Sequence, residues 1–133
     1  MKKKRVESLS RMSQLQAKMR DLGRWRLTAL EQERAQLSDD LMSVFAALEA
    51  GELAYGRQAA LSARRARALQ KRIDELEGQS ERARRKAETH AIRAKLAESA
   101  AEAAAKAHRL ERERKELAEL IERTVARRGA SQG

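Results

Sequence analysis

The stretch E-A-G-E-L-A-Y-G-R, from Glu49 to Arg57, decides how this chain folds. It holds two of the six glycines, Gly51 and Gly56, and the sequence contains no proline. Glycine is therefore the only strong helix breaker in the chain. Long, charged, helix-favouring segments with apolar residues at every third or fourth position lie on both sides. The pattern predicts a turn over residues 51–56 between two long helices that pack antiparallel.

The composition of the 133 residues favours a coiled coil. Charged residues make up 38% of the chain and aromatic residues 2%, and alanine supplies much of the 41% apolar fraction. So few bulky side chains cannot build a multilayered core, whereas long helices and coiled coils have this composition. High charge with few aromatic residues is also typical of disorder. The regular apolar spacing argues against disorder, and the predicted fold is all-α: a two-helix coiled-coil hairpin with a longer second helix.

The first helix is predicted over residues 1–50. Its apolar positions form two runs with the heptad spacing of a coiled-coil seam, but the runs are out of phase near Gly23 and Trp25. This predicts a stutter there. We interpret Trp25 as a partly buried residue that covers the phase shift, with an exposed anchor for a partner as the alternative. The two runs are Val6, Leu9, Met12, Leu15, Met19 and Leu22, followed by Leu30, Leu37, Leu41, Val44 and Leu48.

The second helix is predicted over residues 57–128, followed by a flexible tail at 129–133. Its helix propensity is highest from Ala97 to Ala107, which is rich in alanine. Alanine on the seam also lets two helix backbones approach closely. The predicted seam of this helix is Leu61, either Ala68 or Leu69, then Ile73, Leu76, Ala83, Ala87, Ile92, Leu96, Ala100, Ala103 and Ala107.

Gly78 is the competing position for the turn. A turn near residue 53 places position i opposite about 107 − i, so that large residues of one helix face small residues of the other. A turn at Gly78 would instead bury Lys115 and Arg112 against leucine and valine, at a high cost in free energy. The turn at 51–56 is therefore preferred. It leaves about 20 residues of the second helix beyond the first, with an apolar stripe that has no partner in the chain.

No motif in the sequence carries catalytic chemistry. The chain has no cysteine, and its scattered glycines form no phosphate-binding loop. The two histidines, His90 and His108, are 18 residues apart, too far to share a metal on one helix. A two-helix coil also offers no cavity that would exclude water from a reaction. We expect a protein without enzyme activity, cofactor or metal.

The formal net charge is +10, from 30 basic and 20 acidic residues that are interleaved along the chain. A solvated surface with many salt bridges is the first interpretation, an acidic protein partner the second and nucleic acid the third. The basic clusters at 2–5 and 82–86 lack interleaved aromatic residues for base stacking. Non-specific nucleic-acid binding and self-assembly as a parallel dimer without a turn remain the alternative hypotheses.

The localisation is expected to be cytoplasmic. No apolar run approaches the ~18 residues that a membrane span needs. The basic N-terminus is not followed by the apolar region of a signal peptide. We therefore expect no membrane insertion.

The architecture resembles the FliJ/YscO-type stalk proteins of flagellar and virulence type III export machines. The resemblance covers nearly the whole chain and rests on the early turn, the longer second helix and the charged stretch R-L-E-R-E-R-K-E-L-A-E-L-I-E-R from Arg109 to Arg123. Members of this family look like the two-helix part of the rotary ATPase gamma subunit. The resemblance implies that the end with both chain termini enters the hexameric export ATPase ring. The rest would reach the membrane-embedded export gate, and some members bind secretion chaperones.

The resemblance implies two sets of site residues on a non-enzymatic stalk that lies in the cytoplasm, peripheral to the membrane export apparatus. The gate-binding patch of the family lies in the early second helix, where Leu69, Ile73 and Leu76 are the nearest candidates. The ring-inserting end would comprise Lys2, Lys3, Lys4, Arg5, Leu110, Leu117, Ile121, Val125, Arg127 and Arg128.

Overall fold

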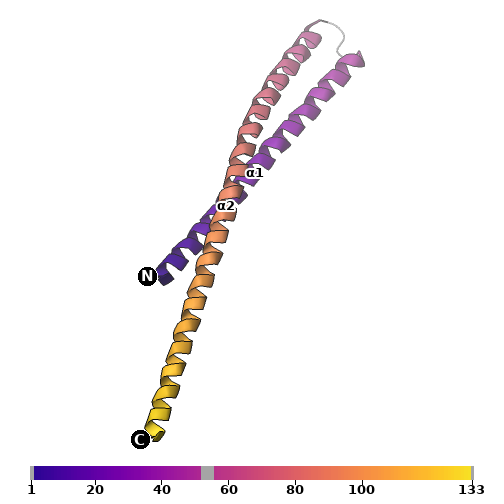
Figure 1. The fold of residues 1–133 in the computed structure, drawn as a ribbon. Helices are drawn as coiled ribbons and strands as arrows, with labels where there is room; N and C mark the ends of the chain where they lie inside the picture. The colour runs from indigo at the N-terminus through magenta and orange to yellow at the C-terminus, as the bar shows by residue number, and fades with distance from the viewer. Residues whose placement is uncertain (1, 52–55, 133) are drawn as a thin grey trace. The chain divides into compact units, whose positions relative to one another are not determined.

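The computed structural model describes the backbone of residues 2–51 and 56–132 and the side chains of residues 3–51 and 56–130. Within these ranges it holds two helices and no strand: α1 (Lys2–Glu49) and α2 (Arg57–Gln132) (Figure 1). The predicted all-α hairpin with a longer second helix is confirmed. α2 has 76 residues and runs past the predicted end at Arg128, so that residues 129–132 are helical rather than a separate tail.

Two glycines in the left-handed backbone region end one helix and begin the other. Gly51 has φ 74° and Gly56 has φ 73°, values that glycine adopts without the clash that a Cβ would cause. The N–H of Gly51 donates to the carbonyl of Leu48 at 3.2 Å, directly after α1. The carbonyl of Gly56 accepts from the N–H of Ala60 at 3.3 Å, at the start of α2. The two predicted turn residues thus have the backbone that a turn requires, and residues 52–55 lie outside the described part.

Contacts divide the chain into two compact units, and each unit contains a part of both helices. The turn unit is Lys18–Ala91, and the terminal unit is Met1–Ala17 with Ile92–Gly133. Neither α1 nor α2 holds, within its described residues, an apolar window long enough to cross a membrane.

The core of the turn unit lies where the bulky aliphatic residues are densest. Leu41 of α1 is buried with Ala66 and Ile73 of α2. Each fully buried leucine or isoleucine contributes roughly 1.5–3 kcal/mol, so this short segment is the main apolar anchor of the hairpin. Partly buried residues from both helices complete the cluster: Leu37, Val44 and Leu69.

The register of the turn unit differs from the predicted one by about one helical turn. Gly23 was expected opposite position 84, but the structure places it against Ala87. Both residues lie on the buried faces of their helices, which keep the heptad spacing without a break. The observed register is the one in which these two faces meet.

The predicted stutter in α1 is wrong. From Val6 to Leu48 an unbroken heptad series of half-buried and buried residues runs along α1 and passes through Gly23 and Leu27. An unbroken heptad keeps the same face towards the partner helix, whereas a phase change would turn it away. Trp25 therefore lies on the outer side of α1, 72% exposed, and its interpretation as a partly buried residue is also wrong.

Because the heptad phase is unbroken, the predicted seams of the terminal unit are also wrong. Met12 and Leu15 of α1 are 55% and 57% exposed, and Ile92 and Leu96 of α2 are 62% and 66% exposed. Smaller or more polar residues take their places between the helices. They are Ser13 and Gln16 of α1, and Ala94, Ala97, Ala101, Ala104 and His108 of α2.

Candidate functional site

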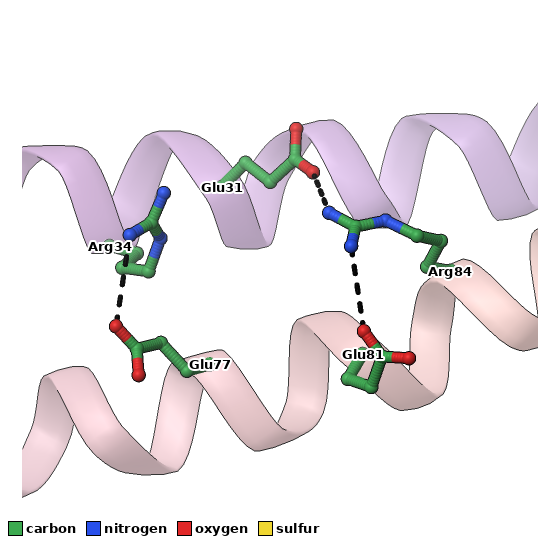
Figure 2. Close-up of polar contacts among 5 residues, drawn as sticks. All are labelled: Glu31, Arg34, Glu77, Glu81 and Arg84. Atoms are coloured by element: carbon green, nitrogen blue, oxygen red, sulfur yellow. Dashed lines mark hydrogen bonds and ion pairs between the residues drawn. The ribbon is translucent and has the colours of Figure 1, made fainter.

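Ion pairs tie α1 to α2 in the middle of the turn unit. Figure 2 shows Arg84 of α2 reaching Glu31 of α1, with a distance of 3.2 Å between guanidinium and carboxylate, and also contacting Glu81 at 3.4 Å. Arg34 of α1 lies 3.8 Å from Glu77 of α2 in the same view. Exposed pairs of this kind contribute roughly 0–1 kcal/mol each, so they fix orientation more than stability.

A further crossing pair joins Arg72 to Glu33 at 3.2 Å, and Arg72 also contacts Glu75 on its own helix at 3.4 Å. The hydrogen bond to Glu33 is the main reason that the pKa of Arg72 lies above its ordinary value. Arg72 thus lies between two carboxylates, one from each helix.

The basic cluster at residues 82–86 is partly neutralised by neighbouring carboxylates. Arg84 binds Glu31 and Glu81, and Arg85 lies 3.4 Å from Glu81. Pairing with carboxylates reduces the positive potential that a nucleic-acid backbone would meet at this cluster.

The three candidate residues for the export gate lie between the two helices. Leu76 has no exposed surface, Ile73 is 6% exposed, and Leu69 packs against the core cluster. A partner could contact Ile73 and Leu76 only if the hairpin opened, whereas Leu69 is partly buried. These side chains thus lie in or against the core, although the resemblance made them the nearest candidates for the gate-binding patch.

The terminal unit contains an apolar groove of about 500 Å³ between the start of α1 and α2. Its α1 side is formed by Arg5, Val6 and Leu9. Because alanine side chains are short, they leave space beside α1 that larger residues would fill. The α2 side consists of Ala100, Ala103, Ala104, Ala107, His108 and Glu111.

Sequence reasoning missed this groove because it assigned the alanines to a single seam. In the structure the alanines of α2 lie on two faces. Ala104 belongs to the half-buried face towards α1, whereas Ala100, Ala103 and Ala107 are exposed. Two heptad series of alanines, offset from each other by one residue, were the available signal.

Beyond Glu111, every described side chain of α2 is exposed, from Arg112 to Ala130. The apolar candidates for the ATPase ring lie on or beside this segment. Leu110 is 46% exposed, and the three others are between 55% and 63% exposed: Leu117, Ile121 and Val125. Contiguous exposed apolar surface of this kind is typical of interaction sites.

The structure does not bring the two basic groups of the candidate ring site together. Lys3, Lys4 and Arg5 are exposed at the start of α1, and Arg5 lines the groove together with His108. The side chain of Lys2 lies outside the described part. At 1.5 Å per helical residue, Arg127 and Arg128 lie roughly 28 Å farther along α2 than His108. Leu110 is the only apolar candidate next to the groove.

The described residues contain no group of three or more histidine, aspartate and glutamate side chains that could hold a metal ion. Comparisons with protein-family models, curated proteins and solved structures found no match for this chain. Two features of the chain remain as candidate sites: the groove of the terminal unit and residues 112–130 of α2, which we call the uncovered segment.

Proposed function

We propose that this chain is a non-enzymatic coiled-coil stalk of a bacterial type III, flagellar-type, protein export apparatus. Its terminal unit would insert into the hexameric export ATPase ring and promote the activity of the ring. The observation that carries the proposal is the continuation of α2 beyond Glu111 as an uncovered helix with an apolar stripe. A cytoplasmic position beside the membrane export apparatus belongs to the same proposal.

The shape and chemistry of this segment suit the axial hole of a ring. It is a single helix, so that it is about 10–12 Å wide including its side chains. Leu117 and Ile121 form an apolar strip on it, while arginine and glutamate cover much of the remaining surface. Such a helix can make apolar contacts with one side of a ring and polar contacts with the others.

Contact with the export gate or with secretion chaperones would fall to the turn unit. Since Leu69, Ile73 and Leu76 are in the core, we assign this role to the exposed apolar residues of α1 instead. Met42 is 66% exposed, and Phe45 is 46% exposed and lines a second groove of about 390 Å³.

The proposal is tested with purified export ATPase in a pull-down and a turnover assay. The intact chain should bind the ring and raise ATP turnover, because the uncovered stripe supplies the contact. The double variant Leu117→Glu with Ile121→Glu should lose both effects. The matched control is Met42→Glu with Phe45→Glu, which places the same charges on exposed apolar positions of the turn unit and should retain them. An intact chain that neither binds nor stimulates the ATPase would exclude the proposed role.

Non-specific binding to nucleic acid is the second candidate, and the net charge of +10 favours it. This binding should weaken by roughly 10³-fold or more between about 50 and 200 mM salt if six or more phosphates are contacted. A titration at these two salt concentrations separates the candidates, because apolar insertion into a ring depends far less on salt. The ion pairs of Arg84 and Arg85 make the export role the better supported of the two.

A further inference from the structure

α2 carries a second apolar face in the terminal unit, separate from the face that packs against α1. Its members follow one another at spacings of four and three residues, and each is exposed. Apolar residues in a heptad series on an exposed helix face are typical of a helix that pairs with another helix. We call this face the outer stripe: Leu96, Ala100, Ala103, Ala107, Leu110, Arg114, Leu117 and Ile121.

The outer stripe is complementary to itself in the antiparallel direction. Its first half is made mainly of alanine and its second half mainly of leucine and isoleucine. We propose that a second copy of this chain packs on the stripe, with a two-fold axis between residues 108 and 109. This register sets Leu110 opposite Ala107 of the second copy and Leu117 opposite Ala100. Large residues then face small ones, as interdigitating layers require.

Charged residues favour the same arrangement over a parallel pair. A parallel pair in register would place the two copies of Arg114 against each other within the stripe, which is unfavourable for like charges. The antiparallel register instead lays Arg114 over Ala103 of the second copy, where its aliphatic stem can pack. At the edge of the stripe, Lys106 and Glu113 directly precede the stripe residues Ala107 and Arg114, so they flank the stripe on the same side. Exposed Lys106 of one copy therefore lies diagonally across the contact from exposed Glu113 of the second copy, and the two-fold axis repeats this attractive pair.

The pairing also fills the groove of the terminal unit. Ala100, Ala103 and Ala107 line the groove and belong to the outer stripe as well. Leu110 and Leu117 of the second copy would therefore enter the groove beside Val6 and Leu9. Residues 110–117 of each copy thus fill the groove of the other copy. This is the self-complementary contact of a two-fold dimer. From residue 96 to residue 121 the contact extends over roughly 38 Å of helix.

Pairing does not depend on the proposed export function. Both would use Leu117 and Ile121, so a chain in the paired state could not place these residues in an ATPase ring. The dimer is tested with the purified full chain alone, so that its failure says nothing about binding to the ATPase.

Sedimentation equilibrium measures whether the full chain has the mass of one copy or of two. The intact chain should form dimers that dissociate on dilution. Lys106→Glu places a glutamate diagonally across the contact from Glu113 in both edge pairs, and it should raise the dimer dissociation constant by roughly tenfold. The double variant Lys106→Glu with Glu113→Lys restores attraction and should recover the affinity. The control Lys18→Glu makes the same charge change in the turn unit and should leave the dissociation constant unchanged.

Cysteine cross-linking determines the direction of pairing, because the chain has no cysteine of its own. Chains with Ala100→Cys are mixed with chains with Leu117→Cys and oxidised. The antiparallel register predicts a disulfide between the two variants, since bonded cysteines need Cα atoms within about 7 Å.

The possible results of both experiments are decisive. Efficient self-cross-linking of the Leu117→Cys chain would show a parallel pair and overturn the antiparallel register. A single-copy mass at all concentrations would overturn the dimer altogether. Failure of Glu113→Lys to rescue Lys106→Glu would overturn the placement of the two-fold axis.

Discussion

Gly23 of α1 and Ala87 of α2 lie in close contact across the turn unit. A Cβ at position 23 would be 3.5 Å from the Cα of Ala87 and 3.7 Å from its Cβ, which are ordinary van der Waals distances. A methyl group therefore fits. Alanine also loses less conformational entropy than glycine when the helix forms. Gly23→Ala should raise the free energy of unfolding by up to about 1 kcal/mol, measured by urea denaturation.

Gly23→Leu is the matched test of the close approach. A leucine side chain would have to displace Ala87 or His90, whose Cδ2 lies 3.6 Å from the same Cβ position. Forced packing of this kind destabilises by roughly 1–3 kcal/mol. If the leucine variant were as stable as the alanine variant, the contact between Gly23 and Ala87 would be refuted.

Ser80 places a hydroxyl group in the buried face of α2. The residue is 6% exposed, and its Oγ has no hydrogen-bond partner among the described residues. Because a buried unsatisfied hydroxyl is unfavourable, Ser80→Ala should stabilise the chain by roughly 1 kcal/mol in urea denaturation. The control is Ser43→Ala, whose exposed hydroxyl donates to the carbonyl of Asp39. That change should alter stability by less than about 0.5 kcal/mol.

Gly51 and Gly56 should tolerate alanine poorly, although a Cβ at either position would meet no atom within 4 Å. Their positive φ is the reason, since the left-handed region costs residues with a Cβ roughly 1–2 kcal/mol. Gly51→Ala and Gly56→Ala should each lower the free energy of unfolding by about that amount. Gly78→Ala is the internal comparison, because Gly78 lies within α2 and the substitution should stabilise the helix. Equal effects at all three positions would contradict this account of the turn.

The turn and the nearby core could be predicted from the sequence because their signals have no competitor. Glycines in a chain without proline mark the turn, and Leu41 and Ile73 belong to apolar series that are dense enough to define the seam. Farther from the turn, α2 offers two heptad series. Hydrophobicity favours the series with Ile92 and Leu96, whereas the structure buries the one with Ala94 because it continues the phase set near the turn. The groove and the outer stripe follow from this choice, which local sequence alone does not determine.

Arg84 makes two ion pairs, but we expect its contribution to stability to be small. Both partners are exposed carboxylates, and the Arg84 side chain is itself 51% exposed. Water and salt screen such pairs, so Arg84→Ala should change the free energy of unfolding by less than about 1 kcal/mol. The effect should shrink further in a denaturation series at increasing salt. A loss of several kcal/mol that persists at high salt would show that the pairs are more than surface contacts.

Leu76 and Leu117 should respond in opposite ways to the same substitution. Leu76 has no exposed surface, so Leu76→Ala leaves a cavity between the helices and should cost roughly 2–5 kcal/mol. Leu117 is 57% exposed, so Leu117→Ala should leave stability almost unchanged when the chain is diluted below its dimerisation range. Its effect should appear instead as weaker self-association and weaker ATPase binding. If Leu117→Ala unfolded the diluted chain as readily as Leu76→Ala does, Leu117 would belong to the core and not to a surface that receives a partner.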